Sequence, residues 1–140
     1  MKNRLRELLL FFIMSISFIA CKDSGSPESI TQLFLISLNK SDLVTARNIS
    51  TKNTRDVLKI WAKLSEGQFS EAVIKQREEN FKVKITKTQN ENDSTAIVYF
   101  ETQPAILPFD HLRLLKTVEK DGRDRWKVDI STLDLANTDN

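Results

Sequence analysis

The sequence predicts an α+β domain in which N-terminal helices pack on a curved antiparallel sheet of about four strands. Apolar residues recur at helical spacing as far as about residue 79, and from Phe81 onward they alternate with polar residues. Turn signals such as Asp121-Gly122 separate the alternating runs, as between hairpin strands. Helices followed by a meander of strands favour one domain, residues 27–134, with its helices on one face of the sheet. A polar tail, residues 135–140, follows.

Four helices are expected before the strands. Ser26 is a good N-cap and Pro27 suits the first helical position, where its missing N–H costs nothing. The apolar stripe of this helix consists of Ile30, Leu33, Phe34 and Leu38, widened by Leu35 and Ile36. Ser41 and Asp42 precede a second, shorter helix. Thr54 can cap a third, and a fourth covers about residues 70–79. One side of the third helix carries Val57, Leu58, Trp61 and Leu64, before Gly67 ends it.

Four strands are expected in the second half. Phe81, Val83 and Ile85 alternate with polar residues, so the first strand has one solvated face. Residues 90–93 form a turn cluster. The second strand is apolar on parts of both faces, which favours a central position; its residues include Ala96, Ile97, Val98, Tyr99 and Phe100. Residues 111–120 form the third strand, with Leu112, Leu114 and Val118 on one side. Trp126, Val128 and Ile130 alternate on the fourth.

The connection between the second and third strands is unusually apolar. Pro104 and Pro108 bracket it, so it cannot be a regular central strand. Ile106, Leu107 and Phe109 stand where polar loop residues are expected. They could form a lip at the mouth of a pocket or an edge that binds a partner. The favoured interpretation is a bulged strand whose apolar residues close the wide end of the core.

The N-terminus has the features of a lipoprotein export signal. Three basic residues in the first six positions precede an uncharged run, residues 8–20, which is too short to span a bilayer permanently. Phe18-Ile19-Ala20-Cys21 resembles the lipobox of bacterial lipoproteins, although Leu is usual where Phe18 stands. We therefore expect a signal peptide over residues 1–20, a lipid on Cys21 and a short tether over residues 21–26. Cys21 is the only cysteine, so no internal disulfide can form.

Removal of the signal changes the charge of the chain. The precursor has 21 basic and 19 acidic side chains; losing three and one respectively leaves 18 of each. A neutral domain lacks the excess of Lys and Arg that nucleic-acid binding requires, so no nucleic-acid partner is expected. The expected partners are a membrane, through the lipid on Cys21, and a small ligand or an envelope protein. Lys22, rather than Asp, follows the cysteine, which favours the outer membrane of the cell envelope.

The chain also resembles a known family. The residues that carry the resemblance are Cys21, Ser26-Pro27-Glu28-Ser29, Leu38-Asn39-Lys40-Ser41-Asp42-Leu43, Asp121-Gly122 and Trp126-Lys127-Val128-Asp129. From about Ser26 to Ile130 they resemble a domain-of-unknown-function family of small bacterial lipoproteins in the nuclear-transport-factor-2-like (cystatin-like) superfamily. The resemblance implies a cone-shaped fold and an envelope location, and no activity. The other architecture that fits the order of elements is a helical cap on an unrelated sheet.

Few residues are candidates for chemistry. His111 is the only histidine, so metal sites with two histidines are excluded, and no metal or cofactor is expected. Asp110-His111 could supply a general base, but neighbours within one strand point to opposite faces, so an edge-strand surface position is favoured for His111. Tyr99, Glu101 and Trp61 could line a cavity, although such aromatic residues are more often core. Trp126 is expected to pack the hairpin against the helices.

Charged residues of the strands are expected to pair on a solvated face. The basic ones are Lys82, Lys84, Lys87, Arg113, Lys116 and Lys127, and the acidic ones are Glu101, Glu119 and Asp129. These observations favour a non-enzymatic, membrane-tethered domain that binds a ligand or a protein. The alternatives are an isomerase-, dehydratase- or hydrolase-like enzyme using Asp110, His111 or Glu101, and a structural spacer in an envelope assembly.

Overall fold

The computed structural model describes residues 25–67 and 70–130. Its helices are α2 (Pro27–Asn39), α3 (Leu43–Asn48), α4 (Lys52–Ser65) and α5 (Glu71–Asn80). Its strands are β1 (Lys82–Asn92), β2 (Thr95–Gln103), β3 (His111–Val118) and β4 (Asp124–Val128). The strands form one antiparallel sheet in the order β1-β2-β3-β4, so the predicted α+β class is confirmed. The expected signal peptide, the lipidated Cys21 and the C-terminal tail lie outside the described residues.

Local capping explains where the helices begin. The side chains of Ser26, Asp42 and Ser70 accept hydrogen bonds from backbone N–H groups of the first turns of α2, α3 and α5. The sequence predicts the cap at Ser26 and the start of α3 at Ser41-Asp42, whereas Ser70, expected inside the fourth helix, is its cap. The predicted cap of α4 is wrong. Thr51 caps this helix, and Thr54 lies inside it with a fully buried side chain that bonds to the chain after β4.

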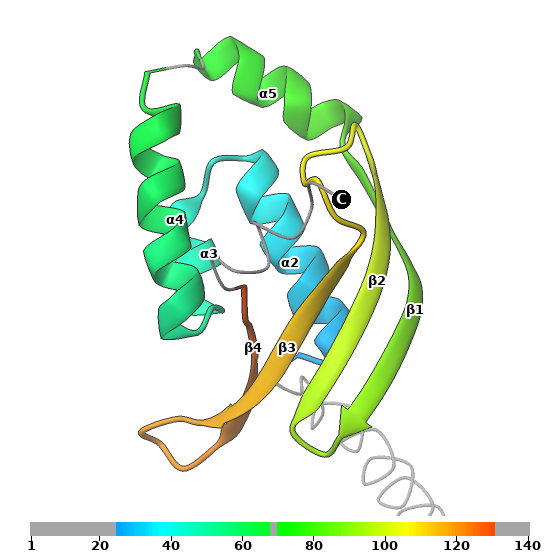
Figure 1. The fold of residues 1–140 in the computed structure, drawn as a ribbon. Coiled ribbons are helices and arrows are strands. Elements are labelled where there is room, and N and C mark those ends of the chain that lie inside the picture. The colour runs from blue at the N-terminus through cyan, green and yellow to red at the C-terminus, as the bar shows by residue number, and fades with distance from the viewer. Residues whose placement is uncertain (1–24, 68–69, 131–140) are drawn as a thin grey trace, which may run out of the picture.

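Helix α2 runs along the sheet and packs against α3, α5, β1, β2 and β4 (Figure 1). Its buried face is centred on Phe34 and Leu35, which have no exposed surface. Leu33 and Ile36, expected in the apolar stripe, are 41% and 38% exposed. Successive helix positions are rotated by about 100° around the axis. Because Phe34 and Leu35 point at the neighbouring elements, Leu33 and Ile36 lie at the two borders of the buried face and are partly exposed.

The predicted apolar side of α4 is only half correct. Val57 and Leu58 are buried, whereas Trp61 is 37% and Leu64 69% exposed. Helix α3 packs against α4, and the second half of α4 continues toward α5 (Figure 1). Periodicity identifies the amphipathic side of a helix, but it does not show how far the neighbouring elements reach along it.

The sheet follows the predicted meander, with β2 as an internal strand between β1 and β3. Strand β1 continues through Asn92, so the turn is Asp93-Ser94, shorter than the cluster expected at 90–93. Val118 is 73% exposed rather than buried beside Leu114, because the β3–β4 hairpin extends past the helices (Figure 1).

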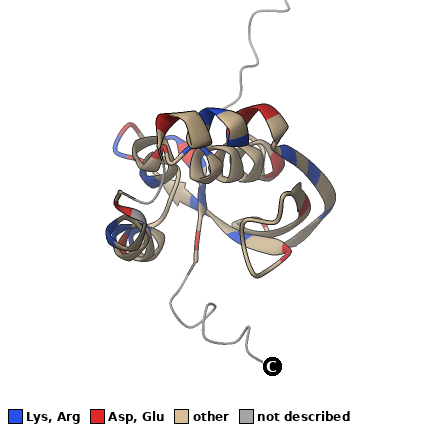
Figure 2. Cartoon of the chain, turned by 90° about the horizontal axis from the view of Figure 1, so that it is seen from above, with Lys and Arg blue, Asp and Glu red and all other residues tan. Residues whose placement is uncertain are grey.

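The core lies between the helices and one face of the sheet. Its buried members are Phe34, Leu35, Ala46, Leu58, Val98, Phe100, Leu112, Leu114, Val128 and Ile130. Ile106, Leu107, Phe109 and Trp126 are half-buried and pack against this cluster. The predicted packing role of Trp126 is therefore confirmed. Viewed from above, the helices cover the concave face of the curved sheet (Figure 2).

Candidate functional site

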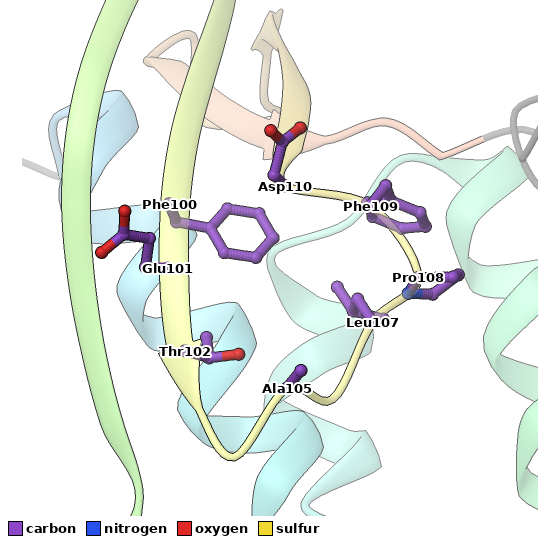
Figure 3. Close-up of a pocket in the computed structure, with 8 residues that line it drawn as sticks. All are labelled: Phe100, Glu101, Thr102, Ala105, Leu107, Pro108, Phe109 and Asp110. Atoms are coloured by element: carbon purple, nitrogen blue, oxygen red, sulfur yellow. The ribbon is translucent and has the colours of Figure 1, made fainter.

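The described surface contains a hollow beside the end of β2. It has a volume of about 500 Å³ and lies between that strand and the loop that returns the chain to β3 (Figure 3). Its lining consists of Phe100, Glu101, Thr102, Ala105, Leu107, Pro108, Phe109 and Asp110. A volume of this size is within the range of small-ligand sites in proteins.

The register of the sheet explains why the hollow exists. Strand β3 pairs with β2 only as far as Tyr99, which lies opposite His111. One further hydrogen bond, 2.8 Å long, joins the N–H of Phe100 to the carbonyl of Asp110. Continued by two residues, the register would place Pro108 opposite Thr102. Proline has no N–H to donate to a ladder, so the strand pairing ends here and the loop separates from β2.

Most side chains that line the hollow are apolar, the hydroxyl of Thr102 points toward the loop, and the carboxylates point away from the centre. Figure 3 shows Phe100 and Leu107 pointing toward one another across the space. The carboxylate of Glu101 points away toward β1, and that of Asp110 points away from the loop. The arrangement therefore offers an apolar interior with acidic groups at the rim. The two carboxylates therefore do not converge inside the hollow, as a catalytic carboxylate pair would.

The structure separates the predicted pocket residues into two groups. Leu107 and Phe109 line the hollow, and Ile106 packs against the core beside it. Trp61 and Tyr99 are not among the lining residues. The favoured bulged strand is wrong, because residues 104–110 form an irregular loop. That loop does close part of the core, and it also forms one wall of the hollow. Phe100, Thr102 and Ala105 were missed, because they join the site through the β2–β3 register, which the sequence does not specify.

Asp110 and His111 do form a pair, which the sequence argument excluded for two residues within one strand. Strand β3 begins at His111, so Asp110 precedes it, and its Oδ1 lies 2.9 Å from Nδ1 of the imidazole. The hydrogen bond with His111 lowers the pKa of Asp110 below its usual value. His111 is exposed as expected, but β3 is internal in the sheet. Because β4 pairs with β3 only from Leu114, β2 is the only strand beside His111.

His111 does not reach the hollow. Its side chain is 49% exposed, and its ring lies 5.4 Å from the ring of Tyr99, centroid to centroid. Tyr99 pairs with His111 in the register, so both side chains lie on the sheet face away from the core. His111 is thus part of the outer sheet surface, and Asp110 is the only member of the pair that lines the hollow.

The expected charge pairs form, but not all on a solvated face, because the side chain of Asp129 is only 5% exposed. Lys84 and Glu101 approach to 3.9 Å, Lys127 and Glu119 to 3.0 Å, and Arg113 and Asp129 to 2.7 Å. Lys116 does not belong to this face. It lies opposite Trp126 on the other face, with its Nζ 4.9 Å from the ring centroid. Basic and acidic positions are interspersed along the elements (Figure 2).

Within residues 25–67 and 70–130, no group of His, Cys, Asp and Glu side chains could hold a metal ion. None of the helices in these ranges is both long and apolar enough to cross a membrane. Comparison with family models, with curated proteins and with solved structures finds no match to this chain.

Proposed function

We propose that this chain is a non-enzymatic binding domain of the cell envelope, anchored through a lipid on Cys21, and that the hollow beside β2 is its ligand site. The observation that carries the proposal is the apolar interior of the hollow, where Phe100 and Leu107 face one another. Ligand sites are concave and mostly apolar, with a few polar groups that orient the ligand. Here the polar groups are at the rim.

The arrangement of helices on a curved four-stranded sheet supports a nuclear-transport-factor-2-like cone as the finer description of the fold. The position of the hollow also suits a tethered protein. The N-terminal end of α2 lies closer to the β1–β2 turn than to the 104–110 loop (Figure 1). An anchor five residues before Ser26 would therefore place the hollow at the end of the sheet that is farther from the start of α2.

Binding in the hollow is testable with a neutral apolar fluorophore, N-phenyl-1-naphthylamine. We expect saturable binding that Leu107→Arg weakens by about tenfold or more, because a charge in an apolar site is costly. Val44→Arg is the control, since Val44 is 69% exposed on α3. Ala105→Trp tests the same site without removing atoms from the core, because Ala105 is exposed. Unchanged binding in both hollow variants, with both proteins folded, would show that the probe binds elsewhere.

The lipid anchor is tested separately. Cells that express the full chain are fed labelled palmitate, and the purified protein is analysed by mass spectrometry. We expect label on the wild-type protein, a mature N-terminus at Cys21 and complete loss of label in Cys21→Ala. An unlipidated N-terminus in the wild type would contradict the anchor. It would leave the hollow and its ligand untouched, so the two parts of the proposal can fail independently.

A further inference from the structure

We propose that the occupant of the hollow is an extended segment of a partner protein, with alternating apolar and basic residues, which adds as a strand to the free edge of β2. This inference rests on the proposed binding function and specifies the ligand of the same site. Two features of the hollow carry it: one wall is the edge of a strand, and the carboxylates of Glu101 and Asp110 stand at its rim.

The strand edge offers unused backbone groups. N–H and C=O groups along a strand point alternately to its two sides. The N–H of Phe100 points toward the β3 side, because it donates to Asp110. The N–H and C=O groups of Thr102, two residues later, point to the same side and therefore into the hollow. Among the described residues, no backbone hydrogen bond from the 104–110 loop reaches Thr102. Strand β2 is therefore paired with β1 at this position, where Thr102 lies opposite Val83, and open on the other side.

The open edge has the dimensions of a short strand addition. Residues 101–103 cover roughly 10 Å at the usual rise per residue of a strand. An added strand would lie about 4.8 Å from β2, in the space that β3 would occupy if its pairing continued past Asp110. Peptides that bind in this way obtain affinity from main-chain hydrogen bonds and specificity from alternate side chains.

The two sides of the added strand would meet different chemistry. Phe100 and Thr102 point to the core side of the sheet, so alternate residues of the peptide would enter the apolar space between Phe100 and Leu107. The remaining residues would lie beside Glu101 on the outer face. The lining contains the carboxyl groups of Glu101 and Asp110, whose side chains are 70% and 81% exposed, and no Lys or Arg. Lys84 lies 3.9 Å from Glu101, but both side chains are exposed, so this pair is weak and a second cation can approach the same carboxylate. The two rim carboxylates therefore favour Lys or Arg at those alternate positions.

The test uses the capped hexapeptide Lys-Leu-Lys-Phe-Lys-Leu, with binding to the full-length protein in detergent measured by fluorescence polarisation. Two derivatives carry N-methyl groups, one on the three apolar residues and the other on the three lysines. Because backbone N–H groups alternate in direction, only one set would face β2. We expect one derivative to bind about tenfold more weakly and the other to bind like the parent peptide. The sensitive set is the apolar one for an antiparallel addition and the lysine set for a parallel one.

The protein is varied at the same position as a second readout. Thr102→Pro removes the N–H that faces the hollow, whereas Thr102→Val keeps the backbone and is the matched control. We expect loss of peptide binding in the first and a clearly smaller effect in the second, where only the lining side chain changes. If Thr102→Pro does not fold, the N-methylated peptides still decide the matter. Equal binding of both derivatives, or equal loss, would overturn the strand addition. Binding of the neutral fluorophore without such a difference would leave the proposed function standing, and binding of neither probe would refute both.

Discussion

Arg113→Met is expected to lower the free energy of unfolding by about 3 kcal/mol, near the lower end of the range for breaking a buried ion pair. The guanidinium bonds to Oδ2 of Asp129 through Nε at 3.2 Å and Nη2 at 2.7 Å. Asp129 is only 5% exposed, and its remaining partner is the hydroxyl of Thr51 at 2.7 Å. Removal of Arg113 would leave a carboxylate buried without a cation. The value is taken from the lower end because the side chain of Arg113 is itself 42% exposed.

Urea denaturation would measure this loss, with Lys59→Met as the control. Lys59 pairs with Asp56 at 3.0 Å, but the two side chains are 63% and 56% exposed, so a change within about 0.5 kcal/mol is expected. The double variant Arg113→Met, Asp129→Leu should recover most of the loss, because it removes both charges. Equal stability of Arg113→Met and Lys59→Met would contradict the buried role of Asp129.

The elements that the sequence predicts best are those with local causes. Ser26, Asp42 and Ser70 each cap a helix through a hydrogen bond to a residue three positions later, and this spacing is visible in the sequence. The exposure of Trp61 and Leu64 depends instead on how far other elements extend along α4. Burial at these positions therefore follows from packing that periodicity does not encode.

Only one wall of the candidate site can be predicted from the sequence, again because only that wall has a local cause. Pro104 and Pro108 identify an irregular, apolar loop from the sequence alone, and Leu107 and Phe109 do line the hollow. The opposite wall depends on which residue of β3 faces which residue of β2. A turn cluster or a hairpin signal would specify this register, but a seven-residue loop between the strands does not. Thr102 therefore has no feature in the sequence that would mark it as part of the site.

Thr54→Val should lower the free energy of unfolding by about 2 kcal/mol. Thr54 lies at the centre of the fold, and its role depends on contacts with residues far away in the sequence. Its buried hydroxyl donates to the carbonyl of Val128 at 2.9 Å and accepts from the N–H of Ile130 at 2.6 Å. Valine has nearly the same shape and a similar helix propensity, so the loss measures the hydroxyl. The N–H of Ile130 would remain buried without its acceptor, which accounts for most of the cost.

Urea denaturation and amide hydrogen exchange together test this role. Thr54→Ser keeps the hydroxyl and loses only a methyl group, so we expect a smaller loss than in Thr54→Val and continued protection of the Ile130 amide. Thr86→Val, at an exposed position of β1, is the control and should change stability by less than about 0.5 kcal/mol. Wild-type stability of Thr54→Val would contradict the bond to Ile130. Faster exchange at Ile130 with a preserved α4 would show that the hydroxyl of Thr54 holds the end of β4 against this helix, a contact that no spacing in the sequence reveals.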